Sequence, residues 1–395
     1  MALDSLLRGK LQWILPVSLD AVVVGTLFGF YATNGGHIAV PLNLPNLKAQ
    51  QAQIKPTYSR DALTDDQLAE LTRIMEEQPL ERTKADYSGI GMNVGDIRHY
   101  SKQQLEQLAL DLQAHGVTSV RVEIVPDLQG YGYFFNSLTD KRMSVLALLN
   151  LNLVRLPPAA INDKSDLWTE QYIRAVQRFL DTYGNKVDSI QILNEPNDNA
   201  WVWSSSGGRD TQIQPEAYAN ILKKAYTLIK RFNPDISVVT GGLLPPTALG
   251  TDYNPLKINT EEPKDPIVWL NAVLEASNGE ANFDMVAVHP YVSLPDLIGH
   301  LNLYRQNLDG RGMSDKGIMV TEAGYSAGNS LDGEAEQARH MLAYLNLAMN
   351  SAAKRVYIFT WKDFPVIGEA NVPETIKYGV FRRPSGALLH YFNPQ

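Results

Sequence analysis

The stretch Ser189-Ile190-Gln191-Ile192-Leu193-Asn194-Glu195-Pro196-Asn197 decides the fold class. Its first five residues form a short, mostly apolar run, which is typical of a buried β-strand. The proline and asparagines that follow favour a turn. The stretch Gly317-Ile318-Met319-Val320-Thr321-Glu322 repeats this arrangement, with its glutamate 127 positions further on (322 minus 195). Each run therefore predicts a strand with a glutamate just past its end.

Short apolar runs of this kind alternate with amphipathic helical segments from Tyr87 onward. We expect strands at Ser88–Asn93, Ser119–Val125, Ser144–Asn150, Ser189–Leu193, Ile236–Gly241, Phe283–His289, Gly317–Thr321 and Arg355–Thr360. We expect helices at Lys102–His115, Leu167–Tyr183, Pro215–Phe232, Pro266–Ser277, Pro295–Leu308 and Glu334–Ser351. Pro126–Met143 shows no clean helical period. Eight such strands in about 300 residues predict an α/β fold, a (β/α)8 TIM barrel. A doubly wound open sheet is the alternative, although no Gly-x-Gly-x-x-Gly or phosphate-loop pattern supports it.

Composition narrows the class of protein. The 395 residues are 44% apolar and 20% charged, as in a globular protein with a sizeable core. A net charge of −8 argues against nucleic-acid binding. The chain has no cysteine, which excludes disulfides, thiolate catalysis and cysteine metal sites.

The N-terminus carries a candidate membrane segment. Leu11–Ala32 is 22 residues long with Asp20 as its only charge, and Arg8 and Lys10 precede it. That length spans a bilayer core, and basic residues before it keep the N-terminus in the cytoplasm. We expect an uncleaved signal-anchor, with the rest of the chain on the periplasmic or extracellular side. The alternative is a helix packed on the protein, because Asp20 and Pro16 both weaken the span.

Three regions follow from these patterns. Residues 1–32 are the predicted signal-anchor, residues 33–80 a linker with one amphipathic helix, and residues 81–395 the barrel. The helix is expected at Thr64–Gln78, with Thr64 as its N-cap.

Five short motifs lie at the predicted strand ends, in chain order. They are Arg121 on the second strand, Asn194-Glu195-Pro196 on the fourth, His289-Pro290-Tyr291 on the sixth, Thr321-Glu322 on the seventh and Trp361 after the eighth. Together they resemble glycoside hydrolase clan A, with families 5 and 39 nearest, over Tyr87 to Phe392. The resemblance implies a retaining mechanism in which Glu195 is the acid/base and Glu322 the nucleophile. It also implies that Asn194 binds the sugar 2-hydroxyl.

The chemistry of the residues agrees with these roles. Glycosidic cleavage needs one carboxyl group to protonate the departing oxygen and another to attack or stabilise the sugar carbon. Glu195 is flanked by Pro196 and apolar Leu193, and burial there would favour its protonated form. Glu322 needs hydrogen-bond donors or positive charge nearby, for which Arg121 and Tyr291 are the candidates. A retaining pair would lie about 5 to 5.5 Å apart.

Further residues are candidates for substrate binding. Arg121, His289 and Tyr291 are expected to face the barrel mouth, Trp361 to form a sugar platform, and Trp201, Trp203 and Asn93 to contact the glycan. Each also has a structural interpretation: Arg121 could form an ion pair with Glu123, His289 could be a core histidine, and the tryptophans could fill the core. Lys362 and Asp363 could contact sugar substituents or form a solvated pair. No metal or cofactor is expected, since the seven histidines show no metal-ligand spacing.

Three functions compete on these grounds. The first is a retaining O-glycoside hydrolase acting on a β-linked glycan. The second is a glycan-binding barrel that handles exopolysaccharide with little catalysis. The third, an aldolase or isomerase, would need a Schiff-base lysine, phosphate site or metal, and the sequence shows none. The sugar, the linkage, endo or exo action and the oligomeric state are not predicted.

Overall fold

The structure is a computed structural model of the chain. It describes residues 64–78, 89–95, 97–98, 100–128, 130–163, 165–198, 212–246, 254–328, 332–362, 378–380 and 383–389.

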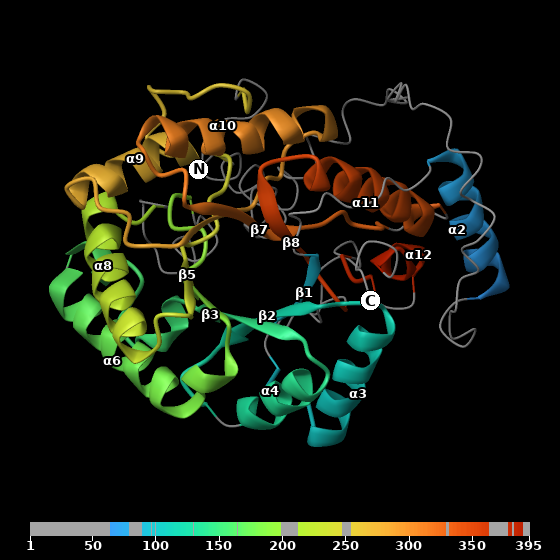
Figure 1. Cartoon of the computed structure of the whole chain (residues 1–395), viewed down its shortest axis with the longest axis horizontal. Helices are drawn as coiled ribbons and strands as arrows, with labels where there is room; N and C mark the ends of the chain where they lie inside the picture. The colour runs from blue at the N-terminus through green and yellow to red at the C-terminus, as the bar shows by residue number, and fades with distance from the viewer. Residues whose placement is uncertain are drawn as a thin grey trace, which may run out of the picture.

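Eight parallel strands close into a barrel in the order β1 to β8 (Figure 1). Closure is made where Ile90 of β1 pairs with Val356 of β8, and Met92 with Ile358. The predicted barrel is therefore confirmed and the open sheet is wrong. The strands are β1 Ile90–Gly95, β2 Ser119–Ile124, β3 Ser144–Leu149, β4 Ser189–Ile192, β5 Ser237–Val239, β6 Met285–Val288, β7 Gly317–Ala323 and β8 Ala353–Ile358.

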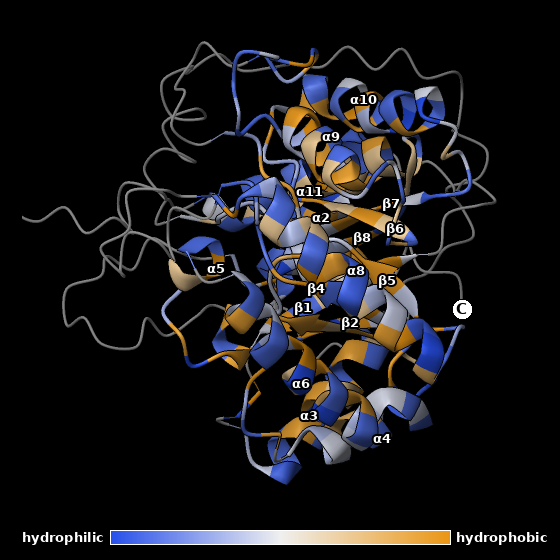
Figure 2. Cartoon of the chain, turned by 90° about the vertical axis from the view of Figure 1, so that its left-hand side faces the viewer, coloured by the Kyte–Doolittle hydropathy of each residue, from blue (hydrophilic) through white to orange (hydrophobic). Residues whose placement is uncertain are grey.

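Helices follow the strands and cover the outside of the barrel (Figures 1 and 2). Their apolar faces turn toward the strands because both faces of a parallel sheet must be buried. The helices are α2 Asp65–Glu77, α3 Lys102–Ala114, α4 Tyr131–Asp140, α5 Ala160–Asp163, α6 Ser165–Tyr183, α8 Pro215–Phe232, α9 Pro266–Ala276, α10 Leu297–Gly310, α11 Gly333–Met349 and α12 Pro384–Ala387.

Successive side chains of each strand point to opposite faces of the sheet, and this alternation divides the core into two parts. On β3, Val145, Ala147 and Leu149 belong to the large core beneath the helices, whereas Leu146 belongs to a separate small cluster. That cluster also takes Val239, Ala287, Met319 and Tyr357 from four other strands, so it fills the barrel interior. Arg121 pairs with Leu146 in register and lies on the same interior face. The interior face of β2 therefore carries Arg121.

Two of the differences from the prediction concern a helix that was not expected and the place of Glu322. Pro126–Met143 contains α4, in which Tyr131, Phe134, Phe135 and Leu138 are buried at helical spacing. Its aromatic, glycine-containing sequence has low helix propensity, so burial rather than propensity holds this helix. Strand β7 runs on to Ala323, which places Glu322 inside the strand rather than after it.

Helix α2 is present where Thr64–Gln78 predicted it, with Thr64 as a capping-box N-cap. It packs on α11 and α12, burying Leu71 and Ile74. Its Glu70 accepts a 2.7 Å hydrogen bond from Arg339 of α11.

The predicted signal-anchor and most of the linker lie outside the described residues. None of the helices in the described part of the chain has the length and apolar character that a membrane crossing needs.

Candidate active site

Glu195 lies in a turn that leaves β4 at the carboxyl end of the barrel. Leu193 and Glu195 have φ angles of 63° and 48°, a region that few non-glycine residues adopt. Backbone hydrogen bonds hold the turn on both sides: Leu193 N donates to Leu149 O at 3.0 Å, and Ile213 N donates to Pro196 O at 2.8 Å. The turn therefore presents the Glu195 carboxyl group from a fixed backbone.

Arg121 joins the proposed nucleophile to three amide side chains. Its guanidinium donates 2.7 Å hydrogen bonds to Glu322 Oε1, Asn93 Oδ1 and Asn194 Oδ1, and a 2.8 Å bond to Gln191 Oε1. Arg121 is only 4% exposed, so this ion pair is little screened by water. The structure thus brings Asn93, Arg121, Asn194 and Glu322 together.

The alternative ion pair between Arg121 and Glu123 is wrong. Glu123 Oε1 instead accepts hydrogen bonds from Asn150 at 3.2 Å and from Asn152 at 3.1 Å. The ion pair that Arg121 forms is instead with Glu322.

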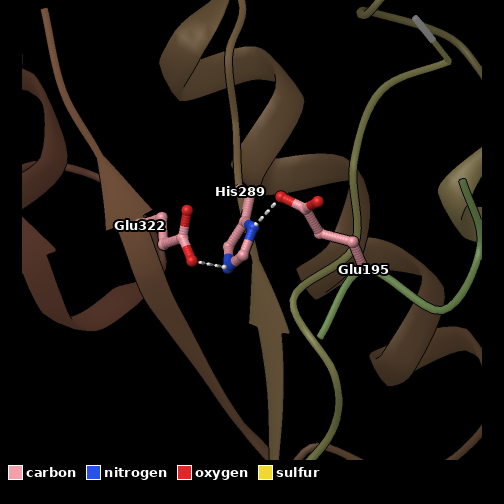
Figure 3. A group of neighbouring side chains, drawn as sticks. All are labelled: Glu195, His289 and Glu322. Atoms are coloured by element: carbon pink, nitrogen blue, oxygen red, sulfur yellow. Dashed lines mark hydrogen bonds and ion pairs between the residues drawn. The ribbon is translucent and has the colours of Figure 1, made fainter. Parts of the chain in front are cut away.

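His289 lies between the two glutamates (Figure 3). Its Nδ1 is 2.8 Å from Glu195 Oε1, and its Nε2 is 2.9 Å from Thr321 Oγ1 and 3.8 Å from Glu322 Oε1. The ring is fully buried, whereas the side chains of Glu195 and Glu322 are 20% and 10% exposed. His289 is thus a bridging residue of the site, and the core-histidine interpretation leaves out both glutamate contacts.

The surroundings shift the two carboxyl groups in opposite directions. Burial raises the pKa of Glu195 and outweighs the opposing hydrogen bond and charge of His289. Burial also acts to raise the pKa of Glu322, but charge interactions with His289 and Arg121, with hydrogen bonds from Arg121 and Tyr291, bring it below its ordinary value. One carboxyl group therefore favours its protonated form and the other its ionised form.

One carboxylate oxygen of Glu195, one of Glu322 and one ring nitrogen of His289 all lie within 4.8 Å of one another. Within the described residues, these three side chains could hold a metal ion. The nitrogens of His289 already contact Glu195 and Thr321, however, so the group is arranged as a hydrogen-bonded acid and base cluster.

Tyr291 approaches the other side of Glu322. Its hydroxyl is 3.5 Å from Glu322 Oε2, at the limit of a hydrogen bond. Burial and then the Glu322 charge raise the pKa of Tyr291 well above its usual value, so the phenol keeps its proton and can donate.

The prediction of Trp361 as a sugar platform is corrected by its position. Trp361 is 1% exposed, belongs to the hydrophobic core and meets His115 edge to face at 5.0 Å. It lies three residues after β8 ends, where strand alternation no longer sets the direction of a side chain. Phe359, the residue directly after β8, is partly exposed, and its N–H donates to Ala323 O of β7 at 2.7 Å. Trp201, Trp203 and Asp363 lie outside the described residues.

Sequence reasoning also missed two residues that make room for the site. A Cβ on Gly241 would meet Pro196 Cδ at 2.6 Å, and a Cβ on Gly242 would overlap the His289 ring. A glycine pair at the end of a barrel strand was the available signal, since glycine often marks close approach of other atoms to the backbone.

The comparisons with known proteins concern the fold. No family model and no curated protein sequence matches the chain. Among solved structures, the chain is similar to an endo-β-1,4-mannanase from Thermotoga petrophila, with a TM-score of 0.54, 11% identity, and 78% of this chain and 76% of that chain covered. It is also similar to a GH5-4 broad specificity endoglucanase from Clostridium longisporum, with a TM-score of 0.51, 12% identity, and coverage of 78% and 96%. A family 1 β-glucosidase from Thermotoga maritima gives a TM-score of 0.52, 14% identity, and coverage of 75% and 87%.

These similarities show that the chain shares the barrel fold of these three glycoside hydrolases. They do not separate family 5 from family 39.

Proposed function

We propose that this protein is a retaining O-glycoside hydrolase that cleaves a β-linked glycan by double displacement. The observation that carries the proposal is the paired carboxyl groups, with oxygens within 4.8 Å and pKa values shifted in opposite directions. This spacing suits a retaining pair, because an inverting pair is set about 6.5 to 9.5 Å apart to admit a water molecule. The shared fold of the mannanase, endoglucanase and glucosidase supports the same class.

In the first step the Glu322 carboxylate attacks the anomeric carbon while the bond to the leaving oxygen breaks. Glu195 gives its proton to that oxygen, so the aglycone leaves as an alcohol. In the second step the Glu195 carboxylate takes a proton from water, and the water oxygen attacks the same carbon. The bond to Glu322 then breaks, and both glutamates return to their starting forms.

Neighbouring side chains support these steps. Arg121 and Tyr291 hold the ionised Glu322 in place for attack. Asn194 Oδ1 accepts from Arg121, which turns the amide nitrogen of Asn194 away from the guanidinium and makes it a donor for the sugar 2-hydroxyl. His289 holds Glu195 in place. Phe359 is the candidate for the apolar sugar platform that the sequence assigned to Trp361, because its backbone lies beside Ala323, the residue after Glu322.

The test is a hydrolysis screen followed by stereochemistry. Purified protein is incubated with β-mannan, β-glucan, other polysaccharides and aryl β-glycosides, and the first-formed anomer of the best substrate is read by proton NMR. We expect hydrolysis with the β-anomer formed first. Release of the α-anomer would show inversion and contradict the mechanism. Binding of a glycan without hydrolysis by the wild type would favour the glycan-binding barrel instead.

We also propose that Leu11–Ala32 anchors the protein in a membrane, with the barrel on the extracytoplasmic side. The length of this stretch and the basic residues before it support the proposal. The full chain should sediment with membranes and resist salt extraction, while a chain beginning near Ala62 should stay in the supernatant. A full-length control with Val22→Lys and Val23→Lys should also leave the membrane fraction. Equal sedimentation of all three proteins would contradict the anchor.

A further inference from the structure

We infer that Gly241-Gly242-Leu243-Leu244, together with Asn197, positions Glu195 against His289. The inference rests on the proposed function and assigns positioning roles to residues that do not touch the reacting atoms. Each of the four consecutive residues contacts one of the two segments that carry Glu195 and His289.

The two glycines set the close approach of both segments. Pro196, next to Glu195, packs where a side chain at Gly241 would begin. The His289 ring lies over Gly242, in space that a methyl group there would fill. A larger residue at Gly241 would push away the turn that carries Glu195, because the added Cβ would also lie 3.2 Å from the backbone oxygen of Ile192. A larger residue at Gly242 would push the imidazole of His289 away, because the three atoms nearest to the added Cβ all belong to that ring.

Hydrogen bonds to the two leucines fix the backbone positions of the segments that carry Glu195 and His289. His289 N donates to Leu243 O at 2.9 Å, which fixes the backbone that carries the imidazole. Leu244 N donates to Asn197 Oδ1 at 3.0 Å, and Asn197 Nδ2 donates to Leu244 O at 2.7 Å. Asn197 lies two residues after Glu195, in the turn that carries the proposed acid. This acid turn is therefore bound to Leu244, and His289 is bound to the preceding residue, Leu243.

Asn197 is well suited to hold this junction. It is 0% exposed, and its Nδ2 also donates to Lys264 O at 2.9 Å. The next residue, Asp198, is 2% exposed and forms a 3.0 Å ion pair with Lys264. Two neighbouring side chains thus tie the acid turn to the segment before α9, and buried hydrogen bonds of this kind are costly to lose.

The consequence is that one short segment fixes the 2.8 Å contact between Glu195 and His289. The charged groups that face Glu195 are His289, Glu322 and Arg121, so a displaced turn changes its contact with all three. A residue that merely stabilised the fold would lower the melting temperature without changing how Glu195 titrates.

The experiment compares Asn197→Leu and Asn197→Asp with the wild type. Leucine has nearly the same shape and removes all three hydrogen bonds, whereas aspartate keeps the acceptor for Leu244 N but places oxygen against two carbonyl oxygens. We expect kcat to fall about 10²-fold with KM nearly unchanged, because a small misplacement of a catalytic group costs this much. The basic limb of the pH profile of kcat/KM reports the loss of the proton from the acid, Glu195, and we expect this limb to move. We also expect a crystal structure to show a longer contact between Glu195 and His289.

Gly242→Ala is a second variant, which acts from the imidazole side and should give the same shifts even if the Asn197 variants fold poorly. Its matched control is Gly310→Ala, because a Cβ on Gly310 meets nothing within 4 Å. Arg305→Met is the control for lost stability: it removes hydrogen bonds to Lys316 O and Met313 O at the opposite end of the barrel.

An unchanged pH profile and an unchanged contact between Glu195 and His289 in folded Asn197 and Gly242 variants would overturn the inference. The inference would also be overturned if the Asn197 and Gly242 variants lost no more activity than Arg305→Met, provided that all these variants have a similar melting temperature. Absence of hydrolysis by the wild type would contradict the proposed function alone, because the crystal structures still decide whether the contact depends on Asn197.

Discussion

Glu322→Gln is expected to lower kcat by at least about 10⁴-fold on every glycoside, including those with activated leaving groups. Glutamine keeps the size of the side chain and an oxygen that can accept from Arg121, 2.7 Å away in the native protein. It removes the negative charge that Arg121 and Tyr291 stabilise, so no bond to the anomeric carbon can form. Initial-rate kinetics on an aryl β-glycoside and on the best polysaccharide measure the loss.

Two further results identify Glu322 as the nucleophile. Small anions such as azide should restore activity to Glu322→Ala on activated substrates and yield the α-glycosyl azide, because the anion attacks from the face that Glu322 leaves open. Glu216→Gln, on the exposed surface of α8, is the matched control and should retain full activity. A Glu322→Gln protein with more than a few per cent of wild-type activity, after exclusion of contaminating enzyme, would remove Glu322 from this role.

The strands were predictable because buried parallel strands are continuous apolar runs. Ser189–Leu193 and Gly317–Thr321 fell close to β4 and β7. Closure of the barrel then turned a separation of 127 positions into oxygens within 4.8 Å. The positions of Arg121 and His289 beside the two glutamates were also predictable, since the carboxyl ends of barrel strands meet at one face.

What the sequence could not predict depends on geometry beyond the strands. Trp361 was expected in the mouth by its place after β8, but the chain turns after Ile358 and buries it beside His115. Asn197 looked like one more turn residue, because its partners Leu244 and Lys264 lie 47 and 67 positions away. The opposite pKa shifts likewise arise from neighbours on other strands, which no local pattern contains.

Glu195→Gln is expected to lower kcat/KM by about 10² to 10⁴-fold on substrates whose leaving oxygen needs a proton. Formation of the glycosyl enzyme should be nearly normal with a dinitrophenyl leaving group, which departs without one. Its hydrolysis should then become slow, because glutamine cannot take a proton from water. A burst of dinitrophenol followed by a slow steady rate is the measurement. In Glu195→Ala, azide should accelerate that slow phase and give the β-glycosyl azide, the opposite anomer from the Glu322 variant.

The pH profile supplies an independent test of the same residue. In the wild type, kcat/KM should rise as pH increases through the lowered pKa of Glu322, since the nucleophile must be ionised. It should fall as pH increases through the raised pKa of Glu195, since the acid must be protonated. Glu195→Gln should lose the basic limb and keep the acidic one, because glutamine does not titrate. A basic limb that persists in Glu195→Gln would assign the acid to another residue, and equal losses for good and poor leaving groups would contradict general acid catalysis by Glu195.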